Sequence, residues 1–260
     1  MVKAIFFDID GTLVSFRTHS IPSSTINALN TLRAKGIKIF ISTGRPKPSM
    51  MHAVGHLPFD GYVTLNGAYC FTADQQEIYK SRIPQTDIER LIRYHTQHSE
   101  VPFVLVDEEE WFITGINDDV KTVTDMVQEK IPDVRPIEEA RNKNILQLIG
   151  YFKQEQDKYF FEEVLTHCTP MRWFPLFADI ISTGNSKRHG IDTMIKHYGI
   201  KLEETMAFGD GGNDIPMLRH AGIGVAMGNS APEVQSAADY VTTSVDEDGI
   251  QHALEHFNII

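Results

Sequence analysis

Cysteine is scarce in this sequence, with only Cys70 and Cys168 among 260 residues. Neither lies at a spacing typical of metal ligands, and the two show no pattern typical of a disulfide framework. We therefore interpret both as small apolar side chains that pack in the interior. Such sparing use of cysteine is typical of proteins from a reducing compartment.

Long hydrophobic segments are also missing. No stretch approaches the roughly 20 consecutive apolar residues that a membrane-spanning helix needs. At the N-terminus, the apolar run from Ala4 to Phe7 ends at Asp8 and is too short for a signal peptide. We therefore expect a cytoplasmic protein without a membrane partner.

Basic residues are in the minority: 24 Lys and Arg stand against 35 Asp and Glu, and the formal net charge is −11. A field of this sign repels nucleic acids and anionic membranes, so we expect neither as a partner. An anionic substrate could bind only where a cation and a few local donors reverse the potential within one cleft. The 11 histidines form no ligand spacing that would supply such a cation site.

What the sequence does contain is an ordinary globular composition, with 42% hydrophobic and 23% charged residues. A chain of this length can form a core domain that carries a smaller one, and it can bury enough surface for a stable monomer. At both ends, short apolar runs alternate with helical periodicity. The predicted strands lie at residues 4–10, 38–43, 205–210, 222–227 and 240–243, and the predicted helices lie at 24–35, 186–198, around Met217 and around Val234.

This alternation predicts an α/β fold. The strands are too continuously apolar for a sheet that is exposed on one face, so they indicate a buried parallel sheet. Gly36 and Gly199 are suited to end the helices that precede them. We therefore predict a Rossmann-like core formed by residues 1–82 and 182–260.

The middle of the chain, residues 83–181, carries a pattern of its own. The predicted helices lie at 86–98, 118–130 and 156–167, and the predicted strands at 101–106, 111–115, 145–152, 171–174 and 178–182. Trp111 and Trp173 are interpreted as packing residues. The segment is therefore predicted to be a smaller α/β cap, joined to the core by two short crossings that permit hinge motion.

Two carboxylates follow the first predicted strand. Asp8 and Asp10 are two positions apart, which places both side chains on the same side of an extended chain, and Gly11 and Thr12 follow at once. Ligands of open parallel sheets bind beyond the carboxyl ends of the strands. One aspartate alone could simply begin a turn, but the pair with Gly-Thr behind it favours a functional site.

The second predicted strand ends in Ser42, Thr43, Gly44 and Arg45. A hydroxyl and a backbone N–H exposed beside glycine can hold phosphate oxygens near the start of a helix. Taken alone, this segment is equally compatible with an ordinary turn between a strand and a helix.

A third predicted strand leads into Asp210 and Asp214. If these lie in one cleft with Asp8 and Asp10, the like charges repel, and a divalent cation relieves that repulsion. Oxygen ligands favour Mg²⁺ over zinc, for which no His or Cys set is present. Lys187, at the start of a predicted helix, is a candidate to bind phosphate and to balance the charge on Asp8.

These segments resemble the four ordered motifs of the haloacid dehalogenase superfamily: D-x-D-G-T at 8–12, Thr43 with Gly44 and Arg45, Lys187, and G-D-G-G-N-D at 209–214. Asn-Gly-Ala at 66–68, together with the position of the insert between the second and third motifs, is similar to Cof-type phosphatases. The resemblance covers the whole chain. It is strongest to bacterial hexose-phosphate phosphatases of that branch.

The resemblance implies a role for each motif residue. Asp8 would attack phosphorus, and Asp10 would protonate the leaving oxygen and then activate water. One Asp8 oxygen, the Asp10 carbonyl and Asp210 would hold Mg²⁺, and Asp214 would support Lys187 or a metal-bound water. The residues expected to contact the substrate are Gly11, Thr12, Thr43, Gly44, Lys187 and Asn213, with Asp179 facing it from the cap.

The function predicted from the sequence is therefore Mg²⁺-dependent hydrolysis of a small phosphate monoester, such as a hexose phosphate, through an aspartyl-phosphate. A phosphotransferase or mutase of the same family remains an alternative. So does a regulatory phosphoacceptor domain, although such domains are generally about half this length and carry the acceptor on a later strand.

Overall fold

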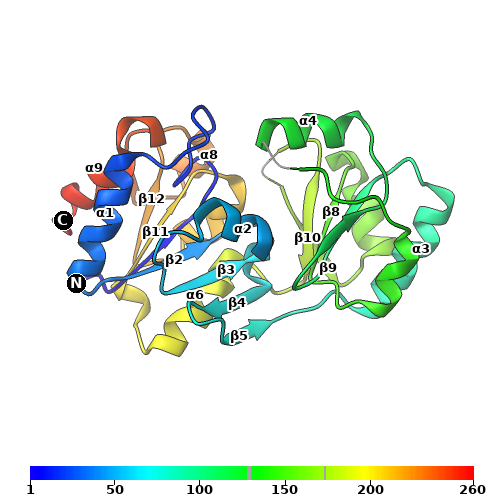
Figure 1. The fold of residues 1–260 in the computed structure, drawn as a ribbon, viewed down its shortest axis with the longest axis horizontal. Helices are drawn as coiled ribbons and strands as arrows, with labels where there is room; N and C mark the ends of the chain where they lie inside the picture. Colours follow the sequence, from blue (N-terminus) through cyan, green and yellow to red (C-terminus); the bar gives the residue numbers. More distant parts are fainter. Residues whose placement is uncertain (128–129, 173) are drawn as a thin grey trace. The chain divides into compact units, whose positions relative to one another are not determined.

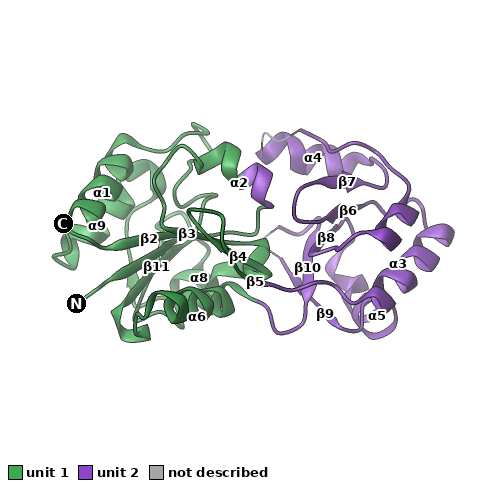
Figure 2. Ribbon diagram, turned by 60° about the horizontal axis from the view of Figure 1, so that its bottom comes forward, with its two compact units in different colours: residues 1–45, 50–79, 186–260 green, residues 46–49, 80–185 purple. Residues whose placement is uncertain are grey.

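The structure is a computed structural model that describes residues 1–127, 130–172 and 174–260. The chain forms two compact units (Figure 2). The core unit comprises Met1–Arg45, Met50–Tyr79 and Ser186–Ile260, and the insert unit comprises Pro46–Ser49 and Lys80–Asn185.

In the described part of the chain, the core unit is built on an eight-stranded sheet with the order β13-β12-β11-β1-β2-β3-β4-β5 (Figure 1). The strands are β1 Ala4–Phe7, β2 Lys38–Ser42, β3 Gly61–Thr64, β4 Tyr69–Thr72, β5 Glu77–Lys80, β11 Thr205–Gly209, β12 Ile223–Ala226 and β13 Tyr240–Val241. The pairs from β13 to β3 are parallel, whereas β4 runs antiparallel to β3. The predicted buried parallel sheet is confirmed.

The central strands are apolar on both faces because helices cover both sides. Every residue of β1 and of β11 is buried. Figure 2 shows α1 and α9 on one face of the sheet, with α6 and α8 on the other. The helices with residues in this unit are α1 Ser23–Ala34, α2 Lys47–Val54, α6 Lys187–Tyr198, α7 Ile215–Leu218, α8 Pro232–Gln235 and α9 Gly249–His256.

Helix α6 has well-defined ends. The Ser186 hydroxyl accepts a hydrogen bond from the backbone N–H of His189 at 3.2 Å, which caps the first turn. Gly199 ends the helix in the left-handed conformation with φ 65°, as the sequence predicts. This capping fixes the position of Lys187, the first residue of the helix.

Among its described residues, the insert unit has a separate five-stranded sheet with the order β7-β6-β8-β10-β9. Its strands are β6 Phe103–Val106, β7 Trp111–Ile113, β8 Gln147–Gly150, β9 Cys168–Met171 and β10 Ala178–Ser182. Every pair in it is antiparallel. Helices α3 Gln85–Gln97 and α4 Asp118–Val127 belong to the same unit, whose own core includes Phe103, Phe112 and Phe160.

Two predicted elements of the insert unit are wrong in detail. The helix predicted over 156–167 is a chain of short turns: a 3₁₀ turn Gln154–Gln156, α5 Asp157–Tyr159 and a π turn Phe160–Val164. The N–H of Leu165 donates to the carbonyl of Phe160 at 2.7 Å, and this wider turn ends the helix while both side chains stay buried.

The strand predicted at 171–174 is instead β9, because Cys168 to Met171 pair with β10. Residues 128–129, at the end of the helix predicted over 118–130, and Trp173 lie outside the described residues. Both cysteines are buried and free, as predicted. No helix in the described ranges combines the length and the apolar character needed to cross a bilayer.

Candidate active site

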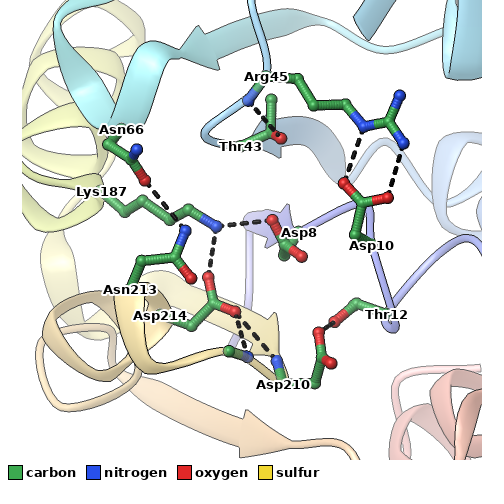
Figure 3. A network of polar contacts seen from close by, with 11 residues as sticks. Asp8, Asp10, Thr12, Thr43, Arg45, Asn66, Lys187, Asp210, Asn213 and Asp214 are labelled. Atoms are coloured by element: carbon green, nitrogen blue, oxygen red, sulfur yellow. Dashed lines mark hydrogen bonds and ion pairs between the residues drawn. The ribbon is translucent and has the colours of Figure 1, made fainter. Parts of the chain in front are cut away.

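Four segments of the core unit carry the motif residues. Asp8 directly follows β1, Thr43 follows β2, Asp210 follows β11, and Lys187 begins α6. Because β1 pairs in parallel with both β2 and β11, their carboxyl ends lie at one edge of the sheet. Figure 3 shows the side chains gathered there. This is the edge at which open α/β sheets bind ligands.

A buried lysine lies at the centre of the site. Lys187 Nζ donates to Asp8 Oδ1 at 2.6 Å and to Asp214 Oδ1 at 2.5 Å, and the Lys187 side chain is fully buried. The other oxygen of Asp214 accepts hydrogen bonds from the backbone N–H groups of Asp210 at 3.0 Å and Gly211 at 2.9 Å. Buried charges are tolerated when they are paired and hydrogen-bonded in this way.

Burial and neighbouring charges shift the pKa values of these groups. Burial raises the pKa of Asp8 to about 7; Lys187 opposes that rise, and Asp214 and Asp10 add to it. Burial by itself lowers the pKa of Lys187, but Asp214 and Asp8 outweigh it and raise that pKa above its usual range. The lysine is therefore held charged, and it does not balance all the negative charge around Asp8.

Asp210 extends the acidic cluster. Thr12 Oγ1 donates to its Oδ1 at 3.1 Å, and Asn229 Nδ2 donates to its Oδ2 at 3.3 Å. Burial, followed by the charges of Asp8 and Asp214, raises its pKa well above the usual value. The predicted substrate residue Thr12 thus directs its hydroxyl at a carboxylate.

The acidic residues suit a hard cation. One carboxylate oxygen from each of Asp8, Asp210 and Asp214 lies within 4.8 Å of the others. Both oxygens of Asp214 already accept hydrogen bonds from Lys187 and from two amides, which favours a supporting role for it. Asp8 and Asp210 supply the kind of oxygen ligands that Mg²⁺ prefers, in a cluster whose repulsion a cation would relieve.

Gly11 is required by the close approach of Asp210. Its φ is +78°, and a Cβ at this position would lie 2.1 Å from Asp210 Oδ2. The carbonyl of Gly11 also accepts a hydrogen bond from Asn229 Nδ2 at 2.9 Å. Only glycine allows the backbone turn after Asp10 to pass this near to the carboxylate.

The segment after β2 contacts a second turn. The backbone N–H of Asn66 donates to the carbonyl of Thr43 at 3.0 Å, and Asn213 Nδ2 donates to Asn66 Oδ1 at 3.0 Å. Asn66 is buried and has a φ of 51°. Gly44 lies between Thr43 and Arg45 in the same turn.

The structure adds three residues to the predicted set. Arg45 pairs with Asp10, Asn66 holds Asn213, and Asn229 links Gly11 to Asp210. The sequence motifs contain Arg45 and Asn66 but do not indicate these contacts. Asn229 lies outside every motif.

Asp179 is the one predicted site residue outside the core unit. It lies in β10 of the insert unit, is buried, and accepts a hydrogen bond from Gln147 Nε2 at 3.4 Å. The other predicted residues, from Asp8 to Asp214, are all in the core unit.

Comparison with known proteins identifies the family. Residues 5–254 match the family of haloacid dehalogenase-like hydrolases. The chain belongs to this family. The predicted resemblance to that superfamily, and the prediction that the protein is an enzyme of its hydrolase class, are confirmed.

Several relatives of this hydrolase are phosphatases. The chain is 48% identical to the solved structure of BT4131, a sugar phosphatase of haloacid dehalogenase subclass IIB, with a TM-score of 0.90 and 100% of both chains covered. It is 40% identical to the phosphatase BT1666 from Bacteroides thetaiotaomicron, with a TM-score of 0.91 and 100% and 96% coverage. It is 25% identical to the HMP-PP phosphatase of Escherichia coli (strain 55989 / EAEC), over 99% and 96% of the two chains.

Proposed function

We propose that this hydrolase removes the phosphoryl group from a small phosphate monoester through an aspartyl-phosphate on Asp8, with Mg²⁺ bound. The observation that carries the proposal is the buried carboxylate of Asp8, held by Lys187 at 2.6 Å among Asp10, Asp210 and Asp214. A carboxylate fixed in this way, beside a lysine that favours its charged form, is suited to act as a nucleophile once a bound cation also favours that form.

The proposed reaction has two steps. Asp8 attacks phosphorus, the bond from phosphorus to the ester oxygen breaks, and Asp10 gives its proton to that leaving oxygen. Asp10 then takes a proton from a water molecule that attacks the same phosphorus, which releases inorganic phosphate and restores Asp8. Both steps need the carboxyl group of Asp10 within hydrogen-bond reach of the reacting oxygen.

The surrounding groups would bind the phosphoryl oxygens. Thr43, Gly44 and Asn213 supply hydroxyl, backbone and amide donors, and Lys187 supplies a positive charge. Mg²⁺, held by Asp8, the Asp10 carbonyl and Asp210, would offset the negative charge of the phosphoryl group.

Sugar phosphates are the proposed substrate class, because the protein BT4131, which is 48% identical over the whole chain, is a sugar phosphatase. Residues 83–181 are proposed to act as a cap that selects among them. We also propose a cytoplasmic location, as inferred from the sequence.

A turnover screen tests the proposal. Sugar, nucleotide and cofactor phosphates are incubated with the protein and Mg²⁺, and inorganic phosphate is measured over many turnovers. We expect sustained release, greatest for sugar phosphates, and its loss on chelation. Release of a single equivalent of the alcohol, with the phosphoryl group retained on the protein, would indicate a phosphoacceptor domain instead. Phosphate delivered mainly to an added alcohol would indicate a phosphotransferase.

A quench experiment tests the intermediate. Substrate labelled with radioactive phosphorus is mixed with enzyme and quenched in acid, and we expect protein-bound label that alkali removes, as for an acyl phosphate. Full turnover without such label, and unchanged turnover in Asp8→Asn, would contradict nucleophilic attack by Asp8.

A further inference from the structure

An ion pair joins the turns that follow the neighbouring strands β1 and β2. Arg45 Nε donates to Asp10 Oδ2 at 2.8 Å, and Arg45 Nη2 donates to Asp10 Oδ1 at 2.7 Å. Each carboxylate oxygen thus receives one donor of a planar guanidinium group (Figure 3). The two side chains are 15% and 23% exposed, so water only partly surrounds the pair. Such two-point pairs fix geometry as well as add energy.

The backbones on both sides of this pair are anchored. The N–H of Arg45 donates to Thr43 Oγ1 at 3.1 Å, and the N–H of Leu65 donates to the Arg45 carbonyl at 3.3 Å. On the other side, the N–H of Gly11 donates to the Val14 carbonyl at 2.9 Å, which closes the turn after Asp10. The pair therefore connects two anchored backbone segments, so Arg45 can set the orientation of the Asp10 carboxyl group.

We propose that Arg45 is a positioning residue that fixes the rotation of the Asp10 carboxyl group for proton transfer. The inference rests on the proposed function, in which Asp10 serves both half-reactions. An unrestrained aspartate rotates about two bonds, and each wrong rotamer moves its oxygens away from the reacting atom. Holding both oxygens by a planar fork removes that freedom, and orientation of a reacting group is a large part of catalysis.

The choice of substitution follows from this geometry. Arg45→Lys keeps the positive charge near Asp10 but replaces the planar fork by a single ammonium that cannot hold both oxygens in the same way. A purely electrostatic role would survive this change largely intact, whereas a positioning role would not. Arg45→Gln, which keeps a planar donor without the charge, is the second variant and replaces the first if that one does not fold.

The test compares two leaving groups under single-turnover conditions, with Mg²⁺ present. Release of the sugar from a hexose 6-phosphate needs a proton on the leaving oxygen, whereas p-nitrophenol leaves readily as an anion. We expect Arg45→Lys to slow release of the sugar about 30-fold and release of nitrophenol less than about 3-fold, within the range of general acid catalysis. KM for both esters should change little.

Two controls separate positioning from general damage. Arg17→Lys alters another arginine of the core unit that pairs with an aspartate, Asp246 at 3.2 Å, and should leave both rates unchanged. Adding Arg45→Lys to Asp10→Asn should slow release of the sugar no further than Asp10→Asn does alone, because the group to be positioned is already lost.

The possible results divide clearly. Three results would overturn the proposal and indicate that Arg45 binds the phosphoryl group itself. These are an equal loss of rate for both leaving groups, a rise in KM alone, and additive losses of rate in the double variant. If the parent released neither alcohol, the proposed function would fail, and this inference would fail with it.

Discussion

At the scale of single residues, the site depends on one lysine that pairs with two carboxylates. Lys187 holds Asp8 and Asp214 at similar distances, 2.6 and 2.5 Å, so each carboxylate keeps the lysine in place for the other. Removing one carboxylate leaves the second pair intact. The fold should therefore survive a change at Asp8 better than turnover does.

Asp8→Asn tests this expectation. The amide has no anionic oxygen to attack phosphorus, so we expect turnover to fall about 10³-fold or more, while the Lys187 to Asp214 pair keeps the melting temperature near that of the parent. Steady-state phosphate release and thermal unfolding measure the two effects. Parent-like activity in the variant would remove Asp8 as the nucleophile.

The acidic cluster also predicts a pH dependence of stability without metal. The pKa of Asp8 is about 7 in the folded protein against 3.8 for the ordinary side chain, and that of Asp210 is also raised. Between these values the folded state holds more protons than the unfolded state, so its stability falls as pH rises from about 4 to 7. Above that window the full cost of the ionised cluster remains.

Asp210→Asn should flatten this dependence. We expect the metal-free variant to melt above the metal-free parent at pH 8, by about 2–4 °C for each kcal/mol of repulsion removed, and to match it more closely at pH 5. Mg²⁺ should raise the melting temperature of the parent at pH 8 but not that of the variant. A variant that Mg²⁺ still stabilises as strongly would exclude Asp210 as a metal ligand.

Side-chain roles that depend on distant contacts could not be predicted from the sequence. Asp10 and Arg45 are 35 positions apart, Asn213 and Asn66 are 147 apart, and Asn229 and Gly11 are 218 apart. That Asp8, Asp210 and Lys187 lie close together could be predicted, because Asp8 and Asp210 directly follow apolar strands and Lys187 begins a helix. Their partners are set by the turns that bring those segments together.

At the scale of elements, the position of α6 depends on one glycine. Gly67 has a φ of +92°, and a Cβ on it would lie 2.1 Å from the carbonyl oxygen of Ser186, the residue that caps α6. An added methyl group must therefore push the start of α6, and Lys187 with it, away from the turn after β3.

Gly67→Ala should cost about 3 kcal/mol or more of unfolding free energy and lower turnover. Gly199→Ala is the matched control, because Gly199 also has a positive φ, 65°, but a Cβ there meets nothing within 4 Å. That change should cost about 1–2 kcal/mol, from backbone strain alone, without altering kcat. Equal losses of activity in both variants would contradict a specific role for Gly67. Denaturant unfolding and kcat provide the comparison.

Elements with a clear period of apolar residues could be predicted from the sequence. Elements whose position depends on pairing with distant strands could not. Strands β1, β2 and β11 are short apolar runs, and α1 and α6 have an apolar face, so local pattern was sufficient. Strand β5 is half-exposed, and its place is set by pairing at the edge of the sheet. The helix predicted over 156–167 fails because Phe160, Val164 and Leu165 all enter the core of the insert unit, which the wider turn permits.

At the scale of the molecule, the insert unit has its own sheet and its own core, and it supplies none of the clustered site residues. We expect replacement of residues 83–181 by a short flexible linker to leave a folded core that binds Mg²⁺ and slowly hydrolyses acetyl phosphate. Discrimination among sugar phosphates should collapse if this segment is a selective cap. A folded core with the parent's ranking of sugars would place selectivity within the core unit.

A point variant tests the same idea in the intact chain. Asp179→Ala should change the ranking of sugar phosphates by kcat/KM more than it changes Mg²⁺ affinity. Asp118→Ala, which removes an exposed carboxylate of the same unit, should change neither. If the order of sugar phosphates by kcat/KM is the same in the two variants, Asp179 does not recognise the substrate.

The order of the sheet has a consequence for the growing polypeptide on the ribosome. Strand β1 is made first, yet its neighbour β11 follows only after the whole insert unit. Roughly 200 residues separate the two strands, which at ordinary synthesis rates is a delay of about 10–40 s. During that time the apolar edge of β1 has β2 beside it but no partner on its other side, and an unpaired edge of this kind invites pairing with other chains.

The insert unit, whose residues are contiguous apart from Pro46–Ser49, can complete its own core in the interval. Folding of the insert unit in that interval would therefore shorten the unfolded part of the nascent chain before the last strands of the core sheet are made.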